Sequence, residues 1–398
     1  IYLCTKISKS SKKILIIYFI LFFKMTFEES LQEMKNIQEK LHDYLEDNGN
    51  NTTLKDIFED NRYHEDLNEL IPLLHFVLKI FNNHYRDENF CSKIEEILLF
   101  FKEDMKTKLS NSELFHIFKS NKKILLFLQQ EGILTFDEQI VKKIISDKYL
   151  EANYPKYFSP EIRPFVNKKW FTKDLKEKDW FPNELPADFY EKRKTGENDG
   201  YICELIRKDS IKDFVIFVTR NACSPNSIIN PSIYETNNFL LKNKKITLIE
   251  YAAFFGSIQI LNYLRLNKAE LTPSLWHYAI HGKNAEIIQL IEENQIKPKD
   301  VSYNKCLIES IKCHHNDIAN YILDQHLLKE KDNTNNVLSN SIKYYNLYFE
   351  PKNIINESSF FYLCKYDHYK LVKILLEEND IDINAKTICK VLFYLNEI

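Results

Sequence analysis

Glycine is scarce in this sequence, and its scarcity excludes several kinds of nucleotide-binding site. The only glycines among the 398 residues are Gly49, Gly132, Gly196, Gly200, Gly256 and Gly282, and none of them are clustered. A Walker loop and a dinucleotide-binding turn both need closely spaced glycines. The sequence therefore contains no phosphate-binding loop of these types.

Paired cysteines and a strong charge bias are also missing. The eight cysteines are scattered, and no two of them form a C-x-x-C pair. In a chain of this length that pattern predicts reduced thiols in a cytoplasmic protein and not a disulfide framework. The formal net charge is -3, so no global field points to nucleic acid or an anionic membrane as a partner.

Residues 1–24 differ from the rest of the chain. Ten apolar residues, Ile14 to Phe23, follow four lysines and precede the first methionine, Met25. One interpretation is upstream sequence translated ahead of a true start at Met25. The other is a signal peptide or membrane anchor, although no small-residue cleavage site follows and the run is short for a membrane span. A membrane enters as a partner only under the second interpretation.

Three further regions follow. Residues 26–150 show apolar residues at helical spacing and no sustained alternation, which predicts an all-helical N-terminal region. Residues 151–200 contain five of the eleven prolines and two Trp-Phe pairs, Trp170-Phe171 and Trp180-Phe181. We expect a connector whose aromatic pairs pack on flanking helices, with a peptide-binding hot spot as the alternative.

Residues 201–398 contain a repeated pattern of two short helices. Its clearest copy is Thr247 to Leu264, where Gly256 separates the two helical segments. Five such units align on a small or polar pair in the first helix, with Ala252 and Ala253 as the reference pair. Insertions at residues 221–245 and 324–357 lengthen the spacing, and Val337 to Phe349 in the second insertion resembles an unpaired helix. Because one unit cannot bury its own apolar face, the copies predict a stacked array.

The clearest copies resemble the ankyrin repeat. Thr247, Ile249, Ala252, Ala253, Gly256, Ile260 and Leu264 match its T-P-L-H-x-A-A-x-x-G-H-x-E-I-V-x-x-L-L pattern, as do Ser274, His277, Ala279, Glu286 and Ile287. The fifth unit adds His368, Val372, Leu375, Leu376 and the turn Ile381-Asp382-Ile383-Asn384, and residues 387–398 begin another first helix. The proline of the pattern is missing in every unit. Residues 198–326 also resemble a divergent ankyrin-containing domain of unknown function typical of parasitic flagellate protists.

The resemblance implies a non-enzymatic module that binds another protein in the concave face of an all-α, ankyrin-type helix-turn-helix solenoid. The residues beside the small pair would face that groove: Tyr251, Phe254, Phe255, Tyr278, His281, Glu309, Lys312, Tyr362 and Lys365. The alternative for Phe254 and Phe255 is packing on a neighbouring repeat or an insertion. No partner is identified, and no cofactor, metal or nucleic acid is expected.

Two histidine patterns raise the question of a metal. Cys306, Cys313, His314, His315 and His326 lie near one another in sequence, but the spacing matches no common zinc site. His277 and His281 are four residues apart on a helix, without the intervening Glu of H-E-x-x-H. We expect structural roles for both sets, and no catalytic residues are assigned. The second functional hypothesis is an N-terminal effector region, enzymatic or membrane-associated, that the repeats target.

Overall fold

A computed structural model of the chain describes most of its length. The described residues are 27–46, 53–58, 62–83, 88–176, 178–182, 184–243, 245–299, 302–327, 334–349, 357–366 and 368–378. The interpretations of residues 1–24, of the turn at residues 381–384 and of residues 387–398 lie outside these ranges.

Helices make up the structure, which confirms the predicted all-α class. The first compact unit includes α2 (Phe27–Glu46), α25 (Glu357–Lys365) and α26 (Tyr369–Glu378). The N-terminal part of the second unit contains α3 (Leu54–Ile57), α4 (Arg62–Glu65), α5 (Leu67–Asn83), α6 (Glu88–Phe100), α7 (Lys102–Lys108), α8 (Asn111–Phe118), α9 (Lys122–Gln130), α10 (Glu138–Ser146), α11 (Lys148–Asn153), α12 (Ser159–Ile162), η1 (Arg163–Phe165), α13 (Lys173–Lys176) and α14 (Phe189–Thr195).

The C-terminal part of the second unit contains the repeated pattern. It consists of α15 (Tyr201–Arg207), α16 (Ile211–Arg220), α17 (Asn238–Lys242), α18 (Leu248–Phe254), α19 (Ile258–Leu266), α20 (Leu275–His281), α21 (Ala285–Glu293), α22 (Asn304–Cys313), α23 (Asn316–Ile322), η2 (Leu323–Leu327), α24 (Thr334–Tyr344) and η3 (Leu347–Phe349). The described residues form no β-strand, and one isolated bridge joins Ile228 to Thr247.

The two compact units divide the chain differently from the domains predicted from sequence. One unit comprises residues 1–50 and 352–398, and the other comprises residues 51–351. Within the first, α2 contacts α26, and Lys370 Nζ lies 3.1 Å from Glu33 Oε2. The predicted fifth repeat, α25 with α26, therefore belongs to the same unit as the N-terminal helix α2.

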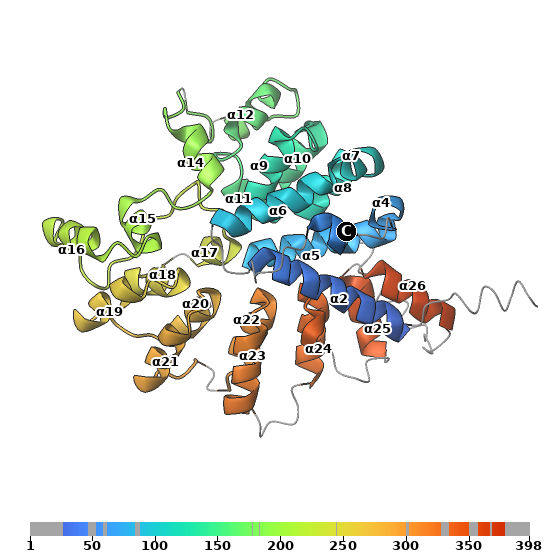
Figure 1. Cartoon of the computed structure of the whole chain (residues 1–398). Helices are drawn as coiled ribbons and strands as arrows, with labels where there is room; N and C mark the ends of the chain where they lie inside the picture. The colour runs from blue at the N-terminus through green and yellow to red at the C-terminus, as the bar shows by residue number, and fades with distance from the viewer. Residues whose placement is uncertain are drawn as a thin grey trace, which may run out of the picture. The chain divides into compact units, whose positions relative to one another are not determined.

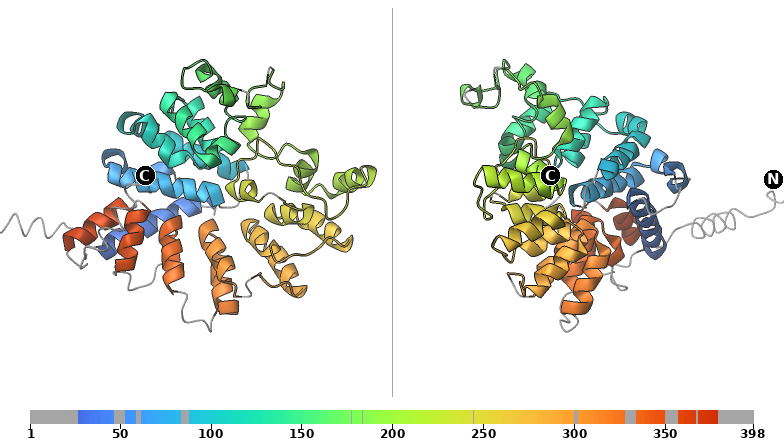
Figure 2. Two further views of the ribbon diagram at one scale, coloured as in Figure 1. Left: turned by 180° about the vertical axis from the view of Figure 1, so that it is seen from behind. Right: turned by 60° about the vertical axis from the view of Figure 1, so that its left-hand side comes forward.

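In the second unit, helix pairs stack one on the next (Figure 1; Figure 2, left). The first helices of successive pairs, α15, α18, α20 and α22, contact one another in order, and α24 follows on α22. The helix predicted within residues 337–349 is thus not unpaired, because α24 extends the row of first helices. On the other side of that row, α5 contacts both α22 and α17.

Local sequence explains where the helices of the reference pair begin and end. Thr247 caps α18 through a reciprocal capping box with Glu250, whose Oε2 accepts from the Thr247 N–H at 2.9 Å. Gly256 has a φ of +69°, a left-handed conformation that favours glycine and ends the first helix. These two residues therefore fix the turn from α18 to α19.

Hydrogen bonds join each pair to the pair before it. Ser257 Oγ donates to the Ile206 carbonyl at 2.6 Å, and the carboxylate of Asp209 accepts from the N–H groups of Gln259 and Ile260. Further along, His315 Nδ1 donates to the Ile280 carbonyl at 2.7 Å. Each turn is thereby bonded to the helix of the preceding pair, so the units depend on their neighbours.

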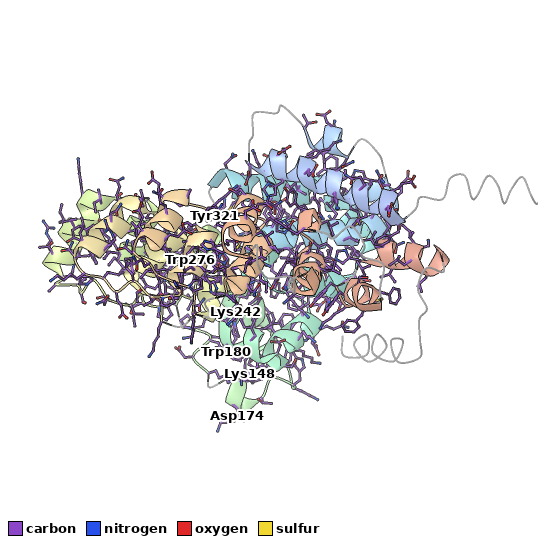
Figure 3. The ribbon with its side chains drawn as sticks, turned by 90° about the horizontal axis from the view of Figure 1, so that it is seen from below. Lys148, Asp174, Trp180, Lys242, Trp276 and Tyr321 are labelled. Carbon is purple, nitrogen blue, oxygen red and sulfur yellow. The ribbon has the colours of Figure 1, made fainter. Side chains whose placement is uncertain are left out.

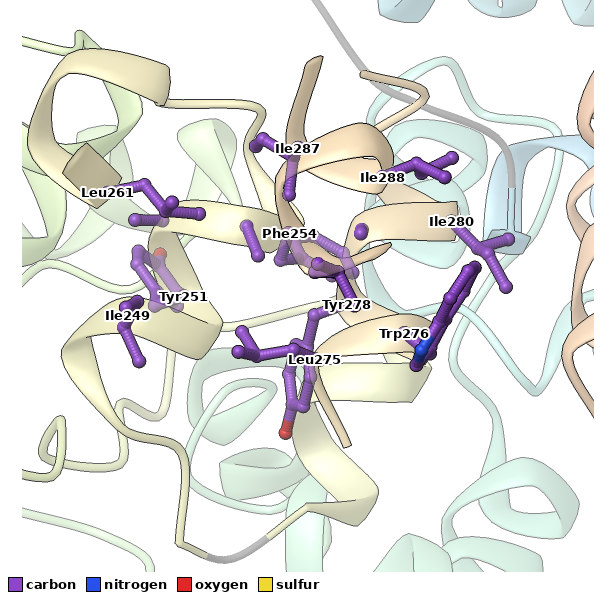
Figure 4. Packing of buried hydrophobic residues seen from close by; sticks show 14 of the residues in the cluster. Ile249, Tyr251, Phe254, Leu261, Leu275, Trp276, Tyr278, Ile280, Ile287 and Ile288 are labelled. Carbon is purple, nitrogen blue, oxygen red and sulfur yellow. The ribbon is translucent and has the colours of Figure 1, made fainter. Parts of the chain in front are cut away.

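Apolar side chains fill the space between the pairs (Figure 4). Ala252 and Ala253 are fully buried, which lets α18 and α20 approach closely. Trp276 is also fully buried, and its Nε1 donates to the Ile296 carbonyl at 2.7 Å. Among the described residues, no helix combines the length and the apolar character needed to cross a membrane.

Candidate functional site

The predicted groove residues of the stacked pairs are mostly buried. Tyr251, Phe254, Tyr278 and His281 are all less than a tenth exposed, and Phe255 is half-buried. The hydroxyl of Tyr251 accepts a hydrogen bond from Arg207 at 3.0 Å. The expectation that these side chains face an open groove is therefore wrong, because the face is already filled.

A single side chain from the first insertion, residues 221–245, fills this face. The ring of Phe239 on α17 lies 4.2 Å from His281, 4.9 Å from Tyr278 and 5.7 Å from Phe254, measured between ring centroids. Lys312 Nζ lies 5.7 Å from the same ring. The alternative expectation, that Phe254 packs on an insertion, is confirmed.

The insertion is held from the opposite side by the N-terminal helices of the same unit. Asn238 Nδ2 donates to the Ser120 carbonyl at 2.6 Å, and the Tyr149 hydroxyl donates to Asn238 Oδ1 at 2.9 Å. Asn237 caps α17 by accepting from the N–H of Phe239 at 2.9 Å. Helix α17 therefore links the stacked pairs to the N-terminal helices.

The remaining predicted residues lie in two places. Glu309 and Lys312 are half-buried on α22 and join His281 in a polar cluster. Tyr362 and Lys365 are half-buried on α25, in the other compact unit, where Lys365 Nζ lies 5.7 Å from the rings of Phe361 and Tyr366. The nine residues thus do not form the single groove that the repeat pattern predicted.

The cluster under Phe239 contains His281, Glu309, Lys312 and Cys313. Glu309 Oε1 lies 2.7 Å from His281 Nε2 and 2.6 Å from Lys312 Nζ. Burial acts to raise the pKa of Glu309, but the hydrogen bond from His281 and the charge of Lys312 outweigh it and hold that pKa well below its ordinary value. Burial also lowers the pKa of His281, so the neutral ring donates its Nε2–H to the carboxylate.

Cys313, His281 and Glu309 have the composition of a nucleophile, base and orienting acid. The Cys313 Sγ lies 3.5 Å from His281 Nδ1, within reach of a thiol hydrogen bond. Burial raises the pKa of this thiol well above its usual value, which disfavours the reactive thiolate. Phe239 lies against the His281 ring, and both His281 and Cys313 are at most 2% exposed, which is typical of a structural cluster.

The same ligand atoms also lie within 4.8 Å of one another, a spacing that a metal ion can bridge. Two features oppose a metal. The Lys312 ammonium already binds Glu309, and the Cys313 Sγ lies nearly the same distance from both ring nitrogens of His281, at 3.5 and 3.7 Å. A shared metal would sit on the lone pair of one nitrogen, which places the sulfur much nearer to that nitrogen than to the other.

The histidines that follow Cys313 make structural contacts. His315 bonds to the Ile280 carbonyl, and His314 Nε2 lies 2.9 Å from the Tyr344 carbonyl. His326 Nε2 lies 2.9 Å from Glu292 Oε1. These contacts agree with the structural roles expected for this set of residues.

An open cleft of about 820 Å³ lies on the other side of the insertion. Its apolar walls come from Trp180 in the connector and from Ile229, Leu240 and Ile246 in and beside the insertion. Trp180 and two lysines of the cleft, Lys148 and Lys242, are labelled in Figure 3. A concave, largely apolar site with a few polar groups is typical of ligand binding. We call it the basic cleft.

Lysines give the basic cleft its charge. Lys148 on α11, Lys156 after it and Lys242 on α17 all line it and are exposed. Lys156 forms an ion pair with Asp179 at 2.8 Å, whereas Lys148 and Lys242 form no ion pair within the described part of the chain. Glu151, which also lines the cleft, is bonded by Lys178. Two cations at the rim are therefore available to an anionic ligand.

A fourth lysine lines the cleft from below. Lys122 on α9 is 2% exposed, and its Nζ donates to the Ile233 carbonyl at 3.0 Å. The Tyr157 ring lies 4.8 Å from the same Nζ. Burial lowers the pKa of Lys122 to about 7, against the opposing charge of Glu235.

Sequence reasoning did not identify the lysines of this cleft. They come from α9, α11, the connector and α17, which are far apart in sequence. Trp180 was the one hint, and it both packs, at 8% exposure, and lines the cleft. Comparisons of this chain with protein families, with curated proteins and with solved structures found no match.

Proposed function

We propose that this chain is a non-enzymatic protein-binding module built on divergent ankyrin repeats. The capping box at Thr247, the left-handed Gly256 and the buried Ala252–Ala253 pair support the repeat assignment, because each occupies its place in the ankyrin pattern. The bonds from each turn to the preceding pair support it as well. In this proposal the concave face holds the chain's own insertion, and the partner binds elsewhere.

The partner's site is the basic cleft, and its ligand is an acidic segment of another protein. The observation that carries this proposal is the pair of exposed rim lysines, Lys148 and Lys242, beside the apolar wall of Trp180 and Leu240. Exposed ammonium groups attract carboxylates, and an adjacent aromatic wall supplies apolar contact area. A peptide with alternating acidic and apolar side chains matches both features.

Panning a displayed random dodecapeptide library on the full chain tests this function. We expect recovered peptides rich in Asp and Glu that bind the double variant Lys148→Glu/Lys242→Glu at least tenfold more weakly. Such a loss corresponds to about 1.4 kcal/mol. The matched control is Lys212→Glu/Lys297→Glu, because both lysines are exposed and lie outside the cleft. Equal binding by both double variants would remove the basic cleft as the site.

A further inference from the structure

Lys122 occupies an unusual position for a lysine. It is the first residue of α9, immediately after Asn121, which caps that helix. Its side chain is almost completely buried, yet it lines the basic cleft together with Ile233 and Glu235. The cleft is thus the described surface that this buried residue borders.

The surroundings of the amine offer few hydrogen-bond acceptors for an ammonium ion. Its Nζ has one hydrogen-bond acceptor among the described residues, the Ile233 carbonyl, although an ammonium carries three donors. The Tyr157 ring covers a second side at 4.8 Å. A buried ammonium held only as an anchor needs more acceptors than these. The environment instead suits a neutral amine.

Other charges near Lys122 come from two elements. Glu235, in the insertion, is 6% exposed, and its charge acts to raise the pKa of Lys122. Behind the Tyr157 ring, Arg193 lies 5.9 Å from the ring centroid and is paired with Glu161 at 2.8 Å. The guanidinium is thereby paired, and Glu235, whose Oε1 accepts from the Asn237 N–H at 2.7 Å, is the acidic residue whose charge acts on the amine.

We propose that Lys122 is the nucleophile of a carbonyl-binding site at the floor of the basic cleft, where its amine condenses with an aldehyde or ketone to form an imine. The amine nitrogen attacks the carbonyl carbon, and the displaced electron pair on oxygen takes a proton. Loss of water from the carbinolamine then forms the C=N bond. The protons exchange with solvent, so the reaction consumes one amine and one carbonyl and releases one water.

Three features of the cleft define the ligand class. Its volume of about 820 Å³ admits a small organic molecule, and Trp180 and Leu240 provide an apolar wall. Lys148 and Lys242 at the rim favour an anionic group on that molecule. The ligand is therefore a small carbonyl compound that also carries a carboxylate. This site goes beyond the proposed function because it requires no protein partner.

The large neutral fraction of the Lys122 amine at pH 7 supports its proposed role as a nucleophile. With a pKa of about 7, about half of the Lys122 side chains are neutral at pH 7. That neutral fraction is about a thousandfold larger than the fraction for a lysine at its ordinary pKa. Buried lysines with lowered pKa values are the type that forms imines in proteins.

Reductive trapping on the full chain tests the proposal. The chain is treated with 4-carboxybenzaldehyde and cyanoborohydride between pH 5.5 and 9, and the modified lysines are mapped by mass spectrometry. We expect Lys122 to be labelled at least tenfold faster than the average lysine at pH 7, with a rate that rises through a midpoint near pH 7. Labelling of Lys122 no faster than that of exposed lysines would overturn the proposal.

Substitutions at Lys122 and at Glu235 test the two side chains separately. The labelled lysines mapped in the unaltered chain are the reference for each variant. Lys122→Arg keeps the positive charge and removes the nucleophile, so the fast labelling should disappear. Lys123→Arg is the matched control on the adjacent residue and should leave it intact. Glu235→Gln removes a charge that raises the pKa of Lys122, so the labelling midpoint should move to lower pH, and an unmoved midpoint would show that this carboxylate does not act on the amine.

Discussion

Phe239 and Leu240 are adjacent on α17, and they belong to two different surfaces. Phe239 packs on His281 and Tyr278 and closes the face of the stacked helices, whereas Leu240 forms a wall of the basic cleft. The insertion therefore fills one concave surface and builds another. The comparison shows that a repeated sequence pattern can predict where stacked helix pairs lie. It does not predict which surface of the stack stays accessible to a ligand.

The two surfaces differ in how their charges are compensated. Under Phe239, Glu309 is bonded to both His281 and Lys312. In the basic cleft, the rim lysines Lys148 and Lys242 have no ion pair within the described residues, and the pKa of Lys122 is lowered to about 7. Satisfied charges contribute to stability, whereas uncompensated ones are available for a ligand. We therefore expect substitutions in the first surface to change stability and substitutions in the second to change binding.

The largest expected effect on stability comes from Gly282→Ala, beneath the filled face. A Cβ atom at this position would lie 2.3 Å from the Ala253 carbonyl oxygen, so α18 and α20 would have to separate. We expect a loss of about 4 kcal/mol in the free energy of unfolding, measured in urea. Gly132→Ala is the comparison, because a Cβ atom there would have no neighbour within 4 Å and only the strain of its φ of +64° opposes the substitution. Equal losses for the two variants would contradict the close approach.

Glu309→Gln should destabilise the filled face by about 2 kcal/mol at pH 7, because it leaves the half-buried Lys312 without its carboxylate. The pKa of Glu309 is depressed in the folded state, so its contribution is complete above the unfolded value and declines as the pH falls below it. The unaltered chain should therefore lose stability below about pH 4.5 more steeply than the variant. Urea unfolding at a series of pH values measures both.

The control for this substitution is Glu204→Gln, at the exposed ion pair with Lys208. Solvent screens that pair, so its removal should change the unfolding midpoint little. A similar loss in both variants would show that the His281–Glu309–Lys312 cluster is no more than a surface interaction.

Lys122 gives an effect of the same direction with pH, in a window above neutral pH. Its pKa is lowered from 10.5 to about 7 in the folded state, so the unfolded chain binds more protons between these values. Stability should therefore rise with pH through this window, by about 2 kcal/mol from pH 7 to pH 9. In Lys122→Met this rise should be lost, as measured by urea unfolding. A rise of the same size in the variant would place the titration elsewhere.

The sequence allowed the helix pairs to be predicted because their signals are local. Thr247, Gly256 and the Ala252–Ala253 pair each act within one or two helical turns, and the structure places caps, turn and close packing at these positions. The insertion at residues 221–245 was recognised from its spacing alone. Its role was not recognised, because an apolar segment such as Phe239-Leu240-Leu241 packs equally well on many surfaces.

The candidate site was not predicted, for two physical reasons. Aromatic side chains such as Tyr251, Phe254 and Tyr278 occur both in protein-binding grooves and in hydrophobic cores. Which of these two roles they have depends on where the insertion packs. Lys122 follows a helix-capping Asn121 and precedes Lys123, a pattern typical of an exposed helix start. Its burial depends on Tyr157 and Ile233, which are far away in sequence.

The most direct test of this account compares two substitutions on the same short helix, Phe239→Ala and Lys242→Glu. For each, the affinity for an acidic peptide recovered from the library is measured by fluorescence polarisation, alongside stability in urea. The account predicts that Phe239→Ala loses about 2 kcal/mol of stability and changes affinity less than threefold. It predicts that Lys242→Glu keeps its stability and binds at least fivefold more weakly. The reverse pattern, with binding lost in Phe239→Ala and retained in Lys242→Glu, would contradict the assignment of the two surfaces.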